Sequence, residues 1–243
     1  MLTDLYIKTY DVLDSTQEEA KRLISKGDAI AGYVITTNRQ LGGRGKYGRP
    51  WKSAVQDVAI TIILQDNRES TERSPQLCYV TAVAVGEAIL SFSDRALQKF
   101  DVQFRWVNDV LLNNKKASGI IIERFQHNFL LIGIGINLRN GQHLKEYNAT
   151  SLESESIHVP YLVFIERLLK YFIHYHNLWH SYGFLPIKNI WIKRAIGLNQ
   201  PINVQLFNKS VSGTFTGLDN HGNLLVSSGT TCSVISAGEV FEM

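Results

Sequence analysis

Hydrophobic and polar positions follow two different periods along the chain, and these periods predict a mixture of strands and helices. Apolar spacing typical of strands occurs in six segments, at residues 5–12, 33–37, 58–64, 102–112, 118–125 and 129–136. Apolar spacing typical of helices predicts four helices, at residues 14–27, 75–92, 161–182 and 187–196. Asp14-Ser15-Thr16 would cap the first helix, and Gly27 would end it.

The order of these segments predicts the fold class. The strands between 102 and 136 are short and adjacent, with Asn113-Asn114 and His127-Asn128 as turns, which favours a mixed or antiparallel sheet. After Gly197 the chain alternates short strands with turn sequences, as a small β-barrel does. We therefore expect an α+β protein with two domains: residues 1–196, a mixed or antiparallel sheet with helices, and residues 197–243, the barrel.

The composition fits a globular protein of a reducing compartment. With 243 residues, 44% of them hydrophobic, the chain can bury a core, and a net charge of +3 does not indicate a surface that coats nucleic acid. Cys78 and Cys232 lie among apolar neighbours, which predicts buried free thiols. Because no leader pattern and no run of roughly 18 apolar residues occurs, we expect a cytoplasmic protein without a membrane span.

Residues 42–53, GGRGKYGRPWKS, are called the basic loop here and carry the densest chemistry of the chain. Glycines and a proline let the backbone turn tightly, while positive charge gathers at Arg44, Lys46, Arg49 and Lys52. The spacing does not match a Walker loop, and a strand rather than a helix follows, which excludes the dinucleotide fingerprint. Trp51 adds a flat stacking surface, so the loop could hold a planar ring together with an anion. The alternative is a solvated hairpin loop.

A second cluster of candidate residues lies at 105–123. Asn108 and Asp109 interrupt a strand with groups that can bind ribose hydroxyls or a metal. Lys115-Lys116 precede the small residues 117–119, which permit a ligand to approach closely. The alternative interpretation is a hairpin with a solvated pair of lysines.

A third cluster, IGIGINL at 132–138, places Gly133 and Gly135 inside a strand that ends near Asn137. Glycines in a strand mark the close passage of a ligand or of another backbone. Ordinary structural glycines are the alternative.

Four motifs resemble, in order and spacing, those of the biotin–protein ligases. They are Asp14-Ser15-Thr16-Gln17, the segment 40–51, the segment 105–123 and the segment 133–138, and the small barrel follows them. The resemblance covers nearly the whole chain, and the basic loop and W-x-N-D…K-x-x-G-I are its most specific parts. It implies a catalytic domain similar to class II synthetases and an SH3-like barrel, in a short form without an N-terminal DNA-binding domain.

The resemblance also implies an activity. Biotin would be joined to the α-phosphate of ATP with release of pyrophosphate, and the biotinyl-5′-AMP would be attacked by one lysine of a biotin carboxyl carrier domain. Mg²⁺ is the implied cofactor, the carrier domain and a second copy in a homodimer are the implied partners, and neither DNA nor a membrane is expected. Because a carboxylate and a triphosphate repel each other, cations should lower the barrier by electrostatics and positioning.

Residues carried over by the resemblance fall into two groups, of which the first binds biotin. The head-group pocket would be lined by Ser15, Thr16, Gln17 and Gln40. The biotin carboxylate and the adenylate phosphate would be held by Arg44, Gly45 and Lys46.

The second group would serve the nucleotide and the reaction. Arg49 would meet the departing phosphates, Trp51 would stack on adenine, and Asn137 would contact the nucleotide. Lys116, together with Arg44, would stabilise the carboxylate as it becomes an acyl phosphate. Asp109 would position the reacting groups or Mg²⁺.

Three positions depart from the family pattern. Gln17 stands where asparagine is usual, Val107 where proline is usual, and Lys46 where a second arginine is usual. A lysine lacks the planar fork that binds phosphate bidentately, so retention of the adenylate is the property most affected.

Other functions are weighed against a biotin ligase. A lipoate–protein ligase uses similar carboxylate activation on a related fold, but the R-G-K-Y-G-R-P-W loop and the short β-rich tail favour biotin. A transcriptional regulator is disfavoured, because the first strand begins within ten residues and leaves no room for a helix-turn-helix. A non-catalytic biotin-binding or carrier-docking module is disfavoured, because cations, a stacking ring and an acidic residue are all present.

Overall fold

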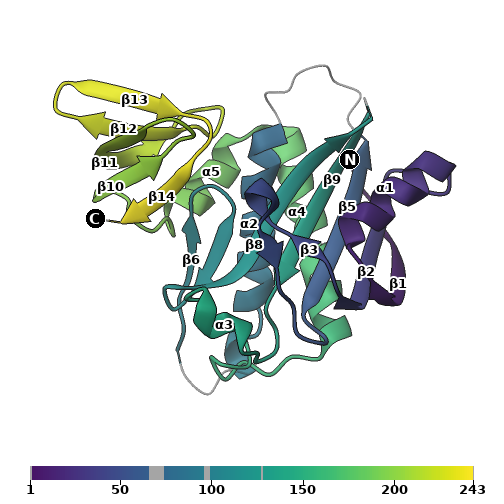
Figure 1. The fold of residues 1–243 in the computed structure, drawn as a ribbon. Helices are drawn as coiled ribbons and strands as arrows, with labels where there is room; N and C mark the ends of the chain where they lie inside the picture. Colours follow the sequence, from purple (N-terminus) through teal and green to yellow (C-terminus); the bar gives the residue numbers. More distant parts are fainter. Residues whose placement is uncertain (1, 66–73, 96–98, 127, 243) are drawn as a thin grey trace.

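Two β-sheets organise the chain, a large one followed by a small one at the C-terminal end (Figure 1). The computed structural model describes residues 2–65, 74–95, 99–126 and 128–242. Within these residues the large sheet has seven strands in the order β1-β2-β5-β9-β8-β7-β6. Only the β1–β2 pair in that sheet is parallel, so the predicted mixed sheet is confirmed for the described residues.

The strands of the large sheet agree with the hydrophobic pattern. Their bounds are β1 (Tyr6–Leu13), β2 (Tyr33–Gln40), β5 (Val58–Gln65), β6 (Val102–Arg105), β7 (Asp109–Leu112), β8 (Lys115–Phe125) and β9 (Phe129–Ile136). Asn113 and Asn114, with φ of 50° and 65°, form the tight turn predicted between β7 and β8. Of the other predicted turn, His127 lies outside the described residues.

Helices cover both faces of the large sheet. They are α1 (Thr16–Lys26), α2 (Ser74–Leu90), α4 (Tyr161–Tyr182) and α5 (Leu185–Ile192), with a single turn at α3 (His143–Glu146). Ile60 and Ile62 pack with α2 and α4 on one face, whereas Ile63 packs with α1 on the other. This division follows from the period of two in a strand, since successive side chains point to opposite faces. No helix among the described residues is long and apolar enough to cross a membrane.

Helix ends show where the sequence prediction holds and where it is wrong. Helix α1 ends at Gly27, which has a left-handed φ of 75°, as predicted, whereas the Ser15 side chain forms no capping hydrogen bond. The helix predicted to reach residue 196 ends at Ile192. Residues after it leave the helix because they pair with β6: Phe104 N donates to Arg194 O, and Ile196 N donates to Phe104 O, both at 2.9 Å.

The small sheet is antiparallel and contains the strands β10 (Pro201–Gln205), β11 (Ser210–Leu218), β12 (Leu224–Ser228), β13 (Thr231–Ile235) and β14 (Glu239–Glu242). Within the described residues their order is β13-β12-β11-β10-β14, so the last strand pairs with the first, as in small SH3-like barrels. Cys232 lies on the edge strand β13 and is exposed, so the prediction that both thiols are buried is wrong for this residue.

The turn between β11 and β12 binds the small sheet to the large one. Tyr79 of α2 donates a hydrogen bond to Gly222 O, and Gln76 Nε2 donates to Asn220 O at 3.1 Å. Trp106, at the end of β6, donates to the same Gly222 O at 3.5 Å. The C-terminal sheet is therefore fixed beside the end of β6.

Candidate active site

A cavity of about 440 Å³ lies beside the start of α1 on the large sheet. Its walls come from the start of α1, the basic loop, β8, β9 and residues 238–241 of the C-terminal sheet. The structure brings to this one cavity every residue that the sequence singles out for binding or catalysis: Ser15, Thr16, Gln17, Gln40, Arg44, Gly45, Lys46, Arg49, Trp51, Asp109, Lys116 and Asn137. Their individual roles stay predictions.

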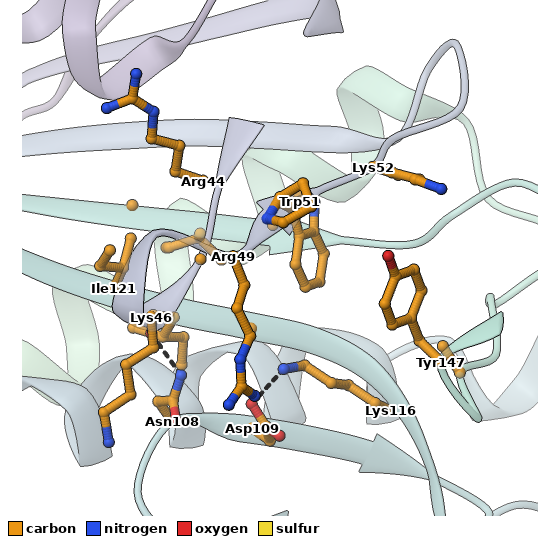
Figure 2. A pocket seen from close by; sticks show the side chains of 18 of the residues that line it. Arg44, Lys46, Arg49, Trp51, Lys52, Asn108, Asp109, Lys116, Ile121 and Tyr147 are labelled. Carbon is orange, nitrogen blue, oxygen red and sulfur yellow. Dashed lines mark hydrogen bonds and ion pairs between the residues drawn. The ribbon is translucent and has the colours of Figure 1, made fainter. Parts of the chain in front are cut away.

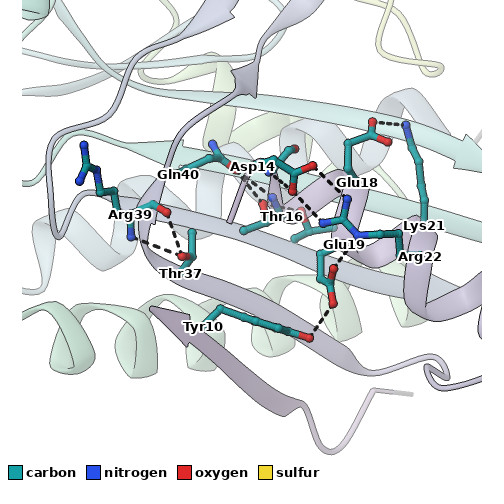
Figure 3. Close-up of polar contacts among 12 residues, drawn as sticks. Tyr10, Asp14, Thr16, Glu18, Glu19, Lys21, Arg22, Thr37, Arg39 and Gln40 are labelled. Atoms are coloured by element: carbon teal, nitrogen blue, oxygen red, sulfur yellow. Dashed lines mark hydrogen bonds and ion pairs between the residues drawn. The ribbon is translucent and has the colours of Figure 1, made fainter. Parts of the chain in front are cut away.

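Two ion pairs and a hydrogen bond connect the first turns of α1 to Asp14 and to β1 (Figure 3). Arg22 contacts Asp14 and Glu19, each at 2.7 Å, and Tyr10 of β1 donates to Glu19 at 2.8 Å. The Arg22 guanidinium lowers the pKa of Asp14 to about 2, so this carboxylate stays ionised. Asp14 also accepts the backbone N–H of Ser15 at 2.7 Å and so orients the residues that enter the cavity.

The α1 end of the cavity contains polar groups with and without partners. Gln40 Oε1 accepts the backbone N–H of Thr16 at 2.9 Å, and Thr61 Oγ1 donates to Thr16 Oγ1 at 2.9 Å. By contrast, both amide atoms of Gln17 are buried and have no partner among the described residues. Because an unpaired buried amide is costly, this end suits a ligand that offers both a donor and an acceptor.

The basic loop forms a short hairpin between β2 and β5. Its two strands, β3 (Gly43–Arg44) and β4 (Pro50–Trp51), pair antiparallel around a turn in which Tyr47 has a φ of 58°. The basic loop is therefore a hairpin, as the alternative interpretation expects, and its residues also line the cavity. Arg44 is exposed and points away from Lys116 and Asp109 (Figure 2).

Trp51 lies over the glycines of the neighbouring strands. A methyl group at Gly135 would overlap the indole ring, and one at Gly119 would meet it at 3.0 Å. The close passage predicted at Gly135 is thus made by a side chain of the protein itself. Trp51 Nε1 is buried without a partner among the described residues, and the ring centre lies 5.6 Å from Lys116 Nζ.

Lys116 reaches the cavity from β8. Its Nζ lies 2.7 Å from Asp109 Oδ1 on the neighbouring β7, and the two residues are joined by a dashed line in Figure 2. The backbone of Lys116 is held on the other side, where its N–H donates to Asn148 O and its carbonyl accepts from Thr150 N. Lys115 is exposed.

Two consecutive residues of the C-terminal sheet bind cations of the basic loop. Lys46 Nζ donates to Gly238 O at 3.0 Å, and Arg49 Nη2 lies 2.7 Å from Glu239 Oε1. Sequence reasoning missed Gly238 and Glu239. The sequence shows only an acidic residue beside a glycine near the end of the chain. No spacing rule connects that position to the basic loop, because Lys46 and Gly238 are 192 residues apart.

Asn137 stands at the end of β9. Its Nδ2 donates to Thr150 O at 3.0 Å, whereas Oδ1 is buried without a partner among the described residues. Asp57 fixes the next turn of chain by accepting the N–H groups of Leu138 and Arg139 at 2.8 and 2.9 Å. The side-chain oxygen of Asn137, Oδ1, can therefore accept a hydrogen bond from a ligand.

Tyr147 was also missed by sequence reasoning. Its ring lines the cavity and faces Lys52, whose Nζ lies 5.7 Å from the ring centre. Figure 2 shows this ring on the same side of the cavity as Lys116 and Trp51. A single tyrosine in a polar stretch carries no pattern that would single it out.

Cys78 is a buried free thiol of the core and is not suited to nucleophilic chemistry. Burial raises the pKa of its thiol to about 12, an effect that the positive charge of Lys46 opposes only in part. The thiol is therefore neutral, and the neutral form is a poor nucleophile. The polar groups that line the cavity are cations, side-chain amides, hydroxyls and the carboxylates of Asp109 and Glu239.

Comparison with known proteins gives consistent results along the chain. Residues 9–138 match the biotin/lipoate A/B protein ligase family, and residues 197–241 match the biotin protein ligase C-terminal domain. A biotin–[acetyl-CoA-carboxylase] ligase from Paracoccus denitrificans is 32% identical over 238 residues, covering 94% of this chain and 97% of that protein. The bifunctional ligase/repressor BirA of Bacillus subtilis is 29% identical and covers 89% of this chain and 68% of its own.

Solved structures share the fold. The biotin protein ligase from Aquifex aeolicus in complex with biotin and ATP superimposes with a TM-score of 0.82 at 24% identity, covering 97% of both chains. That likeness confirms the α+β architecture together with the small C-terminal sheet. From the match to the family model and the 32% identical relative, the chain belongs to the biotin protein ligases of the biotin/lipoate A/B protein ligase family.

Proposed function

We propose that this protein activates biotin with ATP and transfers it to a lysine of a biotin carboxyl carrier domain. In the first step a biotin carboxylate oxygen attacks the α-phosphorus, the bond to the β-phosphate oxygen breaks, and pyrophosphate leaves. In the second step the lysine amine attacks the carbonyl carbon, AMP leaves with the bonding electrons, and the amine gives up a proton. One observation carries the proposal: a single cavity joins a polar end at α1 to a row of cations.

Biotin would bind with its ring system at the α1 end. The ureido group of biotin offers N–H donors and a carbonyl acceptor, which match the unpaired oxygen and nitrogen of Gln17. Ser15 and Thr16 complete this end with a hydroxyl each. The valeryl carboxylate then points toward the basic loop.

This match separates biotin from lipoate. The dithiolane ring of lipoate has no strong hydrogen-bond donor or acceptor, so it would leave both amide atoms of Gln17 buried and unpaired. A site built to hydrogen-bond a substrate rejects an analogue that lacks the bonding groups. The cavity therefore favours biotin.

The cations would neutralise the two reacting anions. Lys116 would meet the biotin carboxylate, and Arg44 and Lys46 would bind the phosphate that becomes part of the adenylate. Arg49 would bind the departing phosphates. Such positioned charges act most strongly in the transition state, where negative charge spreads over the acyl phosphate oxygens.

The residues present fit a magnesium ion that arrives on ATP. No group of three acidic, histidine or cysteine side chains that could hold a metal is found in the described residues. Asp109 would supply one carboxylate, shared with Lys116, and the phosphates would supply other oxygens, which is the usual arrangement for Mg²⁺. When bound, Mg²⁺ would reduce the charge of the phosphates.

The carrier domain would approach the open side of the cavity between Arg49 and Tyr147, since both side chains are exposed there. An enclosed adenylate is needed until the carrier lysine arrives, because water would otherwise hydrolyse the mixed anhydride. A homodimer, and the absence of DNA binding, stay predictions.

Incubation with labelled biotin, ATP, Mg²⁺ and an apo carrier domain tests the function. We expect one label per carrier, no label without ATP, and no label on a carrier whose target lysine is replaced by arginine. Equal or faster transfer of lipoate would contradict the assignment to biotin. Biotinyl-5′-AMP formed without the carrier should be detectable by mass spectrometry.

A further inference from the structure

Arg49 is paired with a carboxylate of the C-terminal sheet. Its Nη2 lies 2.7 Å from Glu239 Oε1, and both residues line the cavity. The neighbouring Lys46 donates to Gly238 O in the same way. The C-terminal sheet thus offers one formal negative charge and one carbonyl dipole to the loop that would bind phosphates.

The position of Glu239 is fixed by packing. A side chain at Gly238 would meet Val204 Cγ1 at 2.9 Å and Leu206 Cδ2 at 3.0 Å, so this part of the chain lies close against β10. Glu239 itself pairs with Gln205 in the β10–β14 ladder. Its carboxylate is therefore presented from a strand rather than from a loose end.

The Arg49–Glu239 ion pair is open to an anion in the cavity. The Arg49 side chain is 66% exposed and that of Glu239 is 26% exposed. Ion pairs with this degree of exposure are weak, because water screens the charges. A phosphate carrying two or more negative charges can replace one carboxylate on the same guanidinium.

We propose that Glu239 is a positioning residue that competes with pyrophosphate for Arg49. The inference rests on the proposed function, because it takes the departing phosphates to lie at Arg49. ATP would displace the carboxylate as its β- and γ-phosphates bind. When pyrophosphate leaves, Glu239 would pair with Arg49 again, which hinders rebinding and limits the reverse reaction. Glu239 touches neither biotin nor the α-phosphate in this sequence of events, so it acts through Arg49 alone.

Titration calorimetry with inorganic pyrophosphate and the nucleotide-free protein tests the competition. Glu239→Gln removes the charge and keeps the shape, and we expect it to bind pyrophosphate roughly two- to fivefold more tightly than the wild type. Glu239→Ala should change the affinity in the same direction. Glu166→Gln is the matched control, because it removes one charge from an exposed position of α4, on the other face of the sheet, and should leave the affinity unchanged.

The proposal requires that the increase in pyrophosphate affinity depend on Arg49. In an Arg49→Ala background, Glu239→Gln should leave pyrophosphate affinity unchanged, whereas a general loss of repulsion would still increase it. Unchanged or weaker pyrophosphate binding by Glu239→Gln, or an equal gain in the Arg49→Ala background, would overturn the proposal.

A kinetic measurement separates this proposal from the proposed function. Wild-type protein that forms no biotinyl-5′-AMP would contradict the function itself. If the wild type forms it, Glu239→Gln should show a lower KM for ATP and stronger inhibition by added pyrophosphate, with the rate of a single turnover little changed. Equal inhibition of both proteins would overturn the competition alone.

Discussion

Lys116 Nζ lies 2.7 Å from Asp109 Oδ1, and the two residues belong to neighbouring strands of the large sheet. The β7–β8 ladder shifts register between Val110 and Leu111, and this irregularity brings Lys116 to the same side of the sheet as Gly119 and Asp109. The carboxylate holds the ammonium in the cavity. A pair of this kind orients the cation without a large conformational change during the reaction.

Replacing Lys116 with alanine should reduce the turnover more than the binding of biotin. The ammonium matters most when charge builds on the acyl phosphate and on the tetrahedral species of the transfer step. We expect a loss of roughly 10²-fold or more in both half-reactions, measured by single-turnover kinetics, with a smaller change in biotin affinity. Lys115→Ala is the control, since Lys115 is exposed, and greater sensitivity there would contradict the assignment.

Lys46→Arg should slow release of the adenylate. An arginine can bind the phosphate through two directed hydrogen bonds, and the difference from lysine is on the order of 1–2 kcal/mol, or roughly tenfold in rate. A chase with unlabelled biotin measures the release. Unchanged or faster release would show that other groups retain the intermediate.

Gly135→Ala should disturb the nucleotide side of the cavity through Trp51. The added methyl group overlaps the indole ring, so the ring must leave its place over β9. Because an aromatic stack on a base contributes roughly 1–3 kcal/mol, we expect the KM for ATP to rise about tenfold or more. Trp51→Ala should raise the KM for ATP by a similar factor. If Gly135→Ala raised this KM by the same factor in a protein that already carries Trp51→Ala, the effect would not act through the indole ring.

His176 should make the stability depend on pH. Burial against α4 neighbours lowers its pKa from 6.5 to about 4, so the unfolded chain binds a proton more readily than the folded one between these values. The contribution is complete above pH 6.5 and is lost as the pH falls toward 4, by up to about 3 kcal/mol. Denaturant unfolding at several pH values measures it, and His176→Phe should remove this part of the slope.

Strand and helix positions could be predicted largely from local patterns. The bounds of β9 and α4 agree with the predicted 129–136 and 161–182, because both depend on apolar spacing over eight residues or more. The end of α5 could not be predicted, since residues after Ile192 pair with β6 far away in the sequence. β2 extends to Gln40 for a similar reason: its parallel partner β1 continues to Leu13.

The candidate site was predictable in its residue types and not in its contacts. Basic and small residues at characteristic spacing indicated the cavity. Alternation along β8 accounts for Lys116 lining the cavity while its neighbour Lys115 is exposed. The partners of Lys46 and Arg49 come from the other end of the chain, where no local pattern marks them. Predicted close passage at Gly133 likewise left open what approaches it, and the structure places Gln17 and Ile121 there.

Residues 238–241, which complete the cavity wall, are synthesised long after the basic loop and the strands of the large sheet. Domains generally fold as units during synthesis, beginning with the N-terminal part, so the large sheet can form before β14 has left the ribosome. A nascent chain at that stage would hold the α1 end of the cavity and a basic loop without its C-terminal acceptors. During translation the core can therefore form before the wall of the cavity is complete.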